Sequence, residues 1–154
     1  ELERYDDVVP PSGQEDSYLF GLLRDLAKEK KRFRILDIGC GLGYVAKAAK
    51  EMYPESEVSG MDISSEIISK AREIDHLESV SFSIGSEIEL PYENSFFDFA
   101  VCRFSIHHYP QMTRHLNEVY RVLKEQGIYL IIDVVPDIPS PIVVWSIGGI
   151  ISGS

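Results

Sequence analysis

The sequence has little cysteine and little positive charge, and these shortages exclude several classes of protein. Its two cysteines, Cys40 and Cys102, lie in apolar stretches without a CxxC spacing or a secretory apolar segment ahead of them. Neither a disulfide framework nor a zinc site is predicted, and a cytoplasmic location is expected. There are 15 Lys and Arg against 25 Asp and Glu, for a formal net charge of -10. Since nucleic acids and anionic membranes bind clustered basic residues, neither partner is expected.

Long hydrophobic runs are also lacking. The longest mainly apolar stretch, residues 142–151, is too short to cross a bilayer and has no flanking basic residues, so a membrane anchor is disfavoured. The 154 residues are 44% hydrophobic and 26% charged, which is typical of one soluble domain. We expect that domain to span residues 1–154, with an amino-terminal helix at 12–30, a core at 33–135 and an apolar tail at 136–154.

Short apolar segments alternate along the chain with segments of helical periodicity. Strands are predicted at residues 33–38, 57–61, 80–84, 97–102 and 128–135, and helices at residues 12–30, 44–52, 64–74 and 111–123. Strands this uniformly apolar are typical of a parallel sheet covered on both faces. The sequence therefore predicts a three-layer, doubly wound α/β fold. In such folds the ligand binds outside the carboxyl ends of the strands, near the switch in strand order.

A glycine-rich turn follows the first predicted strand. Residues 35–43 read Ile-Leu-Asp-Ile-Gly-Cys-Gly-Leu-Gly, with glycines at 39, 41 and 43. Such glycines let the backbone approach a ligand closely, and the next helix presents free amide groups. The dinucleotide pattern GxGxxG would require glycine where this chain has Tyr44. A NAD-dependent oxidoreductase is therefore disfavoured, while a glycine turn of purely structural role stays an open alternative.

An acidic residue, Asp62, directly follows the second predicted strand. It lies about 19 positions beyond Gly43, a spacing that suits a carboxylate accepting hydrogen bonds from both ribose hydroxyls of a nucleoside. The alternative is an acid at a helix amino terminus, where Ser64 and Ser65 would share the capping.

These motifs together resemble the class I S-adenosylmethionine (SAM)-dependent methyltransferases. The acid plus GxGxG of residues 37–43 resembles their first motif, residues 85–98 resemble their GDAExLPF and SFD segment, and residues 121–127 resemble their RVLKPGG turn. The resemblance implies a Rossmann-like methyltransferase fold, SAM as cofactor and a small-molecule methyl acceptor. Family members place an acid against the adenine amine, where this chain has Ser86 followed by Glu87.

The resemblance also implies which residues bind SAM. Asp37 would complement the ammonium group, Asp62 the ribose, and Ile63 one face of the adenine ring. The full predicted cofactor-binding set is Asp37, Gly39, Cys40, Gly41, Gly43, Asp62, Ile63, Ser86, Glu87 and Cys102.

Two adjacent histidines, His107 and His108, follow the fourth predicted strand and are the candidates for a general base. Methyl transfer from SAM needs a base only when the acceptor must lose a proton, so a packing role for the pair is the alternative. His76 and His115 lie among charged neighbours and are predicted to be surface residues. No ligand set of metal-binding spacing is present, so no metal is predicted.

Two features of the sequence leave alternatives open. No segment after the fifth predicted strand matches the β-hairpin that ends the family fold, so either a shortened chain or a tail that forms a homo-oligomer is expected. Ser86 in place of an acid keeps a noncatalytic SAM-binding subunit as the alternative function. The acceptor itself cannot be identified from variable loops.

Overall fold

The computed structural model describes residues 14–28 and 30–133, and the chain divides into two units, Glu1–Lys30 and Lys31–Ser154. The described part of the first unit is helix α2 (Gln14–Leu26), followed by a turn. Leu19 and Leu23, one helical turn apart, are fully buried. The helix predicted at 12–30 is therefore confirmed but ends earlier. The apolar tail at 136–154 lies outside the described residues.

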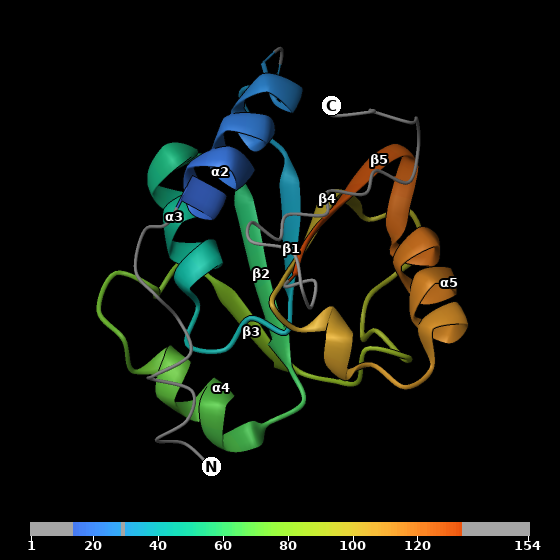
Figure 1. The fold of residues 1–154 in the computed structure, drawn as a ribbon. Coiled ribbons are helices and arrows are strands. Elements are labelled where there is room, and N and C mark those ends of the chain that lie inside the picture. Colours follow the sequence, from blue (N-terminus) through green and yellow to red (C-terminus); the bar gives the residue numbers. More distant parts are fainter. Residues whose placement is uncertain (1–13, 29, 134–154) are drawn as a thin grey trace. The chain divides into compact units, whose positions relative to one another are not determined.

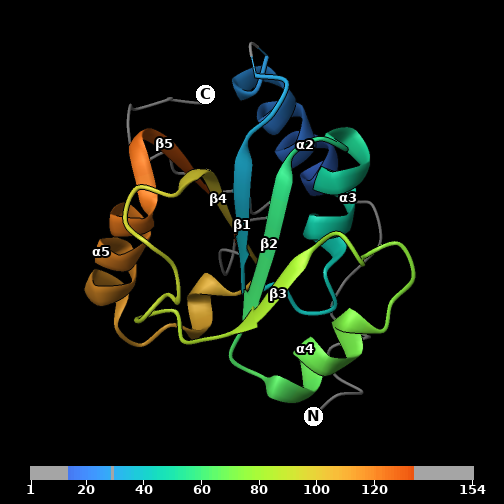
Figure 2. The same cartoon turned by 180° about the vertical axis from the view of Figure 1, so that it is seen from behind.

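The second unit is an α/β sheet with the predicted topology. Five parallel strands run in the order β3-β2-β1-β4-β5, with the switch in strand order between β1 and β4 (Figures 1 and 2). The strands are β1 (Arg34–Ile38), β2 (Glu57–Asp62), β3 (Ser81–Ile84), β4 (Phe97–Arg103) and β5 (Leu123–Ile132). The connecting elements are α3 (Tyr44–Met52), α4 (Ser65–Arg72), the 3-10 turn η1 (Ile106–His108) and α5 (Met112–Val122). The predicted doubly wound architecture is confirmed.

The central strands are buried on both faces, because helices cover both sides of the sheet (Figures 1 and 2). Residues 97–102 of β4 are all buried, in agreement with a sequence that is apolar except for Asp98. The core cluster around them joins β1, β4 and β5 to α5, and it includes Leu36, Ile38, Ala100, Val119 and Tyr129. None of the helices within residues 14–28 and 30–133 is long and apolar enough to span a membrane.

The fifth strand differs from its prediction. We expected a helix to Leu123 and a strand from 128 to 135, but β5 begins at Leu123, directly where α5 ends, and closes at Ile132. Phe97 pairs with Leu123 while Phe99 pairs with Ile128, so the intervening residues 124–127 bulge out of the ladder. The reason is burial: Leu123 is 5% exposed beside Phe97, whereas residues 124–126 are exposed. Residues 134–135 lie outside the described residues.

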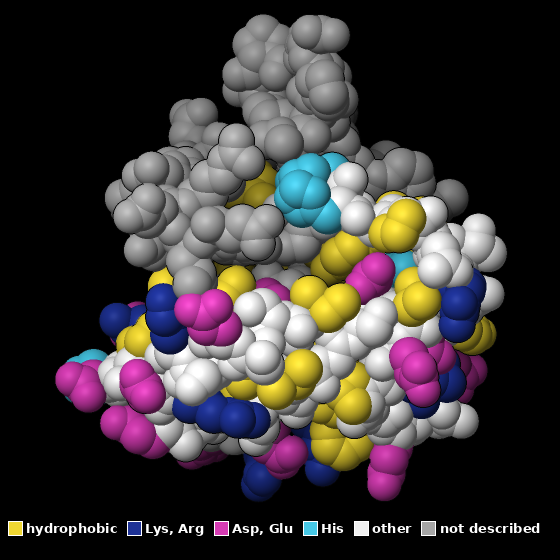
Figure 3. Space-filling view, turned by 90° about the horizontal axis from the view of Figure 1, so that it is seen from below, with side chains coloured by type: hydrophobic (Ala, Val, Ile, Leu, Met, Phe, Trp, Pro, Cys, Tyr) yellow, Lys and Arg dark blue, Asp and Glu magenta, His cyan; other side chains and the backbone are white. Residues whose placement is uncertain are grey.

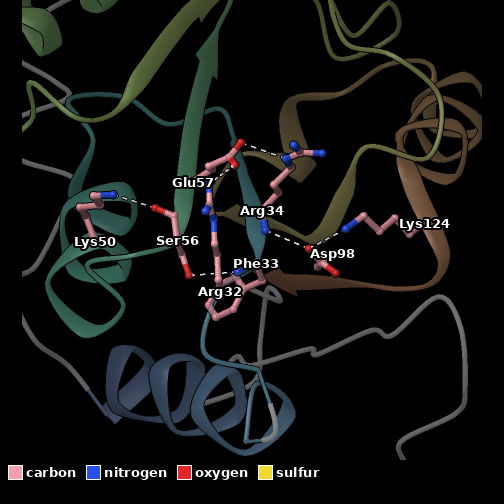
Figure 4. Close-up of polar contacts among 8 residues, drawn as sticks. All are labelled: Arg32, Phe33, Arg34, Lys50, Ser56, Glu57, Asp98 and Lys124. Carbon is pink, nitrogen blue, oxygen red and sulfur yellow. Dashed lines mark hydrogen bonds and ion pairs between the residues drawn. The ribbon is translucent and has the colours of Figure 1, made fainter.

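Ion pairs and hydrogen bonds join the strands at their amino-terminal end (Figure 4). The buried carboxylate of Asp98 accepts the backbone N–H of Arg34 at 2.9 Å and the ammonium of Lys124 at 3.1 Å. Glu57 accepts the side chains of Arg32 and Arg34 at 3.0 and 2.9 Å. Arg32 and Arg34 therefore support strand pairing at this end, which lies opposite the carboxyl ends where a ligand is expected.

Replacement of Asp98 tests how much this end of the sheet contributes to stability. Asp98→Ala is expected to lower the free energy of unfolding by about 2 to 3 kcal/mol, because the Arg34 amide and the Lys124 ammonium lose their acceptor. Urea unfolding followed by circular dichroism measures the change. Glu125→Ala, which removes an exposed carboxylate of β5, is the control and should change stability by less than about 0.5 kcal/mol. Equal unfolding midpoints for the two variants would contradict the role given to Asp98.

Candidate functional site

The glycine-rich turn between β1 and α3 lies at the carboxyl end of the sheet, the side seen from below in Figure 3. Gly39, Gly41 and Gly43 have φ angles of 70°, 53° and 86°, in the left-handed region that favours glycine. The amides of Gly39 and Cys40 donate to the carbonyl of Met61 at 2.8 and 2.9 Å. The turn is thereby folded back onto the end of β2.

The three glycines of the turn have different surroundings. A Cβ at Gly39 would lie 2.6 Å from Ser105 Oγ, and one at Gly43 would lie 3.0 Å from the ring of Phe82. At Gly41 a Cβ would meet no atom of the described residues within 4 Å. The outer two glycines allow the turn to pack, while the middle one leaves its backbone accessible to a ligand.

Asp37, in β1, is a buried acid whose second carboxylate oxygen has no hydrogen-bond partner among the described residues. Its side chain is 2% exposed, and burial raises the pKa of Asp37 to about 7, an effect that the nearby charge of Arg103 partly offsets. An unpaired buried carboxylate is costly, and a cationic donor placed beside it would remove that cost. Asp37 therefore fits the ammonium group predicted from the resemblance.

Asp62, at the end of β2, joins the glycine turn to the start of α4. Its two carboxylate oxygens accept the amides of Gly41 at 3.1 Å and Ser64 at 3.0 Å. The Ser64 hydroxyl itself caps α4 by accepting the amide of Ile67 at 3.2 Å. Capping is thus done by Ser64, and each Asp62 oxygen keeps a free lone pair for a hydroxyl donor. The arrangement suits a ribose diol, which was the prediction.

Beside Asp62, two large apolar side chains are exposed. Ile63 is 69% exposed and Ile84, which pairs with Asp62 in the sheet register, is 51% exposed. Ser86 and Glu87 follow in a tight turn, where the Ser86 hydroxyl accepts the amide of Ile88 and donates to the Glu87 carboxylate, both at 3.4 Å. An exposed apolar surface next to these polar groups has the character needed to hold a planar heterocycle.

The two predicted cysteine contacts are buried. Cys40 is 7% and Cys102 0% exposed, and burial raises the pKa of both thiols, that of Cys102 to about 12. Both therefore serve as small, neutral core residues next to the site. No group of three or more His, Cys, Asp or Glu side chains within the described ranges is placed to hold a metal ion.

The two candidate bases differ in their partners. His107 Nδ1 lies 2.6 Å from Asp133 Oδ1, and the His107 amide donates to Asp133 Oδ2 at 3.0 Å. The ring of His108 packs against that of His107 at a tilt of 47°, with the centroids 3.9 Å apart. Histidine side chains are exposed on this face, with hydrophobic side chains close to them (Figure 3). Asp133 directly follows β5, at the same edge of the sheet as Asp62, which is the last residue of β2. The sequence predicted a strand through residue 135, which placed Asp133 inside that strand, so no local signal marked it as a site residue.

The prediction that His115 is a surface residue was wrong. Its side chain is 0% exposed: Nδ1 lies 2.9 Å from the Glu87 carbonyl and Nε2 lies 2.7 Å from the Tyr129 hydroxyl. Because a carbonyl only accepts, Nδ1 carries the proton and Tyr129 donates to Nε2. Burial lowers the pKa of His115, which keeps it neutral. The histidine thereby connects the Glu87 turn to β5, and the ring of Tyr109 packs against it at a tilt of 58°, with the centroids 4.7 Å apart. His76 is exposed, as predicted.

Arg121 holds the segment that follows the Glu87 turn. Its guanidinium donates to the carbonyls of Leu90 and Tyr92 at 2.9 and 2.7 Å and forms two hydrogen bonds, both 2.8 Å, with Glu118. Glu118 in turn accepts the Leu90 amide at 2.7 Å. This fork-to-fork pair fixes the loop between β3 and β4 onto α5. In the sequence Arg121 is recognisable only as part of the motif at residues 121–127, and this anchoring contact was not predicted.

Fold and site together define a doubly wound α/β domain with one acid near the carboxyl end of β1 and another at the end of β2. A profile of the methyltransferase domain matches residues 29–144. The chain therefore belongs to the class I SAM-dependent methyltransferase family.

Three relatives with similar sequences come from bacteria and a plant. The uncharacterized methyltransferase YcgJ of Bacillus subtilis is 33% identical over 116 residues, covering 73% of this chain and 45% of YcgJ.

The crystal structure of YcgJ matches with a TM-score of 0.66 over 74% of this chain and 49% of YcgJ. A demethylmenaquinone methyltransferase of Listeria welshimeri is 33% identical over 120 residues, which are 74% of this chain and 50% of the enzyme. The rice 2-methyl-6-phytyl-1,4-hydroquinone methyltransferase 2 is 28% identical over 124 residues, 80% of this chain and 36% of the enzyme. The chain spans about half the length, or less, of these relatives.

The buried His115 network gives a prediction on stability. His115→Leu is expected to lower the free energy of unfolding by about 2 to 3 kcal/mol, because it leaves the Tyr129 hydroxyl and the Glu87 carbonyl unpaired. Adding Tyr129→Phe to that variant should restore part of the loss, since the orphaned hydroxyl is then removed. A double-mutant cycle by urea unfolding measures the coupling. Strictly additive losses would show that the two side chains do not depend on each other.

The buried acid of β1 gives a prediction on pH. Because the pKa of Asp37 rises from 3.8 to about 7 on folding, the folded state holds its proton more tightly than the unfolded chain. This contribution to stability is complete below the unfolded pKa and is lost as pH rises through about 7. Asp37→Asn should therefore gain stability relative to the natural chain as pH rises, by up to about 4 kcal/mol. Thermal unfolding without ligand measures this, and a pH-independent difference would refute it.

Proposed function

We propose that this chain binds SAM across the glycine turn and the ends of β1 and β2, and transfers its methyl group to a small, lipophilic acceptor. The observation that carries this proposal is the buried carboxylate oxygen of Asp37 that has no hydrogen-bond partner among the described residues. A nucleoside with a cationic amino-acid portion supplies the donor that Asp37 lacks.

The remaining residues fit other parts of the same ligand. Asp62 accepts the ribose hydroxyls, Ile63 lies against the adenine ring, and Ser86 with Glu87 provides acceptors for the exocyclic amine. SAM, when bound, supplies a methyl group on a sulfonium that is already activated for displacement. The protein contributes by holding donor and acceptor in line, which is worth several kcal/mol of the barrier.

An aromatic, quinol-like acceptor is the best-supported class. Two of the relatives carry names that refer to quinone or hydroquinone substrates. Near the glycine turn, Leu42 and Tyr44 are each 38% exposed, and apolar side chains at this position suit a lipophilic ring.

Calorimetric titration with S-adenosylhomocysteine tests cofactor binding. Asp37→Asn and Asp62→Asn should each weaken binding roughly 10-fold to 100-fold, the effect of losing one or two charge-assisted hydrogen bonds. Asp75→Asn, at an exposed site after α4, is the matched control and should bind like the natural chain. Absence of binding in the natural chain would refute the proposal, and binding of NAD instead would favour an oxidoreductase. Binding without turnover on any acceptor would favour the noncatalytic alternative.

A further inference from the structure

The pair formed by His107 and Asp133 has a geometry that fixes one imidazole tautomer. One carboxylate oxygen lies 2.6 Å from Nδ1 and the other accepts the backbone amide of the same histidine at 3.0 Å. A carboxylate held at both oxygens by one residue cannot turn away from the ring. Because an ionised carboxylate only accepts hydrogen bonds, the proton of neutral His107 resides on Nδ1 and the lone pair on Nε2.

The free nitrogen of this pair is accessible. The side chain of His107 is 40% exposed while that of Asp133 is 9% exposed, so the acid is covered and the imidazole reaches the surface. Among the described residues, Nε2 makes no hydrogen bond, in contrast to His115, both of whose ring nitrogens are bonded.

The pair also lies close to the glycine turn. Ser105, two residues before His107, donates to the Gly39 carbonyl at 3.4 Å. Phe104, directly before Ser105, has a φ of 53°, and its amide donates to the Ile132 carbonyl at 2.7 Å, which ties the start of this loop to β5. A bulky residue in the left-handed region is strained, and such strain is typical of functional loops. His107 is therefore positioned beside the site proposed for SAM.

We propose that His107 is the general base of the reaction, that Asp133 is its positioning residue, and that the acceptor is an aromatic hydroxyl compound. This inference rests on the proposed function. The hydroxyl gives its proton to Nε2, its oxygen forms the new bond to the methyl carbon, and the carbon–sulfur electron pair stays on sulfur. The imidazolium then releases the proton to water. An acceptor that is already a free nucleophile, such as a tertiary amine or a thioether, would gain nothing from this base.

The tautomer is tested first, without turnover. In a two-bond ¹H–¹⁵N NMR spectrum recorded in mildly alkaline buffer, His107 of the natural chain should show a protonated Nδ1 and an unprotonated Nε2. In Asp133→Asn the amide group donates to Nδ1, so the proton should move to Nε2, which removes the lone pair that accepts the substrate proton. Protonation of Nε2 in the natural chain would overturn the proposal.

Turnover is then measured as S-adenosylhomocysteine release with a series of para-substituted phenols, from 4-methoxyphenol to the largely ionised 4-nitrophenol. His107→Asn keeps a donor toward Asp133 but removes Nε2. Both His107→Asn and Asp133→Asn should lower kcat for 4-methoxyphenol roughly 100-fold, the lower end of general-base catalysis, with KM for SAM nearly unchanged. The loss should shrink to a few-fold for 4-nitrophenol, which needs no base.

His76→Asn, the same substitution at an exposed histidine, is the control and should match the natural chain throughout. An equal loss for every phenol would show a merely structural role and overturn the proposal. If the natural chain turns over none of the phenols, the hydroxyl acceptor class is overturned. Titration with S-adenosylhomocysteine then shows separately whether cofactor binding stands.

Discussion

At Gly39 the backbone is confined between the end of β2 and the loop that follows β4. The Gly39 amide donates to Met61, its carbonyl accepts from Ser105, and a Cβ would lie 2.6 Å from the Ser105 hydroxyl oxygen and 3.1 Å from the Tyr109 hydroxyl. No side chain fits there, so the close contact of three strand ends depends on glycine. That contact sets where Asp37, Asp62 and the His107 loop lie relative to one another.

The two acids at the strand ends are stabilised to different degrees, and this difference has a functional meaning. Asp62 is paired with two backbone amides and fixes the shape of the turn before any ligand arrives. Asp37 has a buried carboxylate oxygen without a hydrogen-bond partner in the part of the chain that the structure describes, at a cost to the folded protein. A ligand that brings a cation to Asp37 recovers that cost as binding free energy. Asp62 is thus held in place before a ligand binds, whereas Asp37 lacks a cationic partner that the ligand would supply. The site is preorganised, and binding completes its hydrogen bonds.

Local patterns in the sequence were sufficient for strands β1 to β4 and for the glycine turn, because each depends on neighbouring residues. The start of β5 depended instead on the contact of Leu123 with Phe97, a pairing between distant segments that displaced the expected turn at Gly127. The burial of His115 could have been predicted from helical periodicity, since His115 shares one face of α5 with Val119 and Val122. Its polar partners, however, come from the β3–β4 loop and from β5, and no local pattern reveals them.

The histidines show why residue type alone does not assign chemistry. His115 has both ring nitrogens bonded and is enclosed, so it has no lone pair or proton to exchange and serves to connect segments. His107 has one nitrogen held by a carboxylate and the other directed to the surface, an arrangement that leaves a single defined lone pair. The same side chain is thus structural or chemically available according to what its second nitrogen contacts. Only the fold determines that contact, because the Asp133 carboxylate reaches His107 from a strand 26 residues further along the chain.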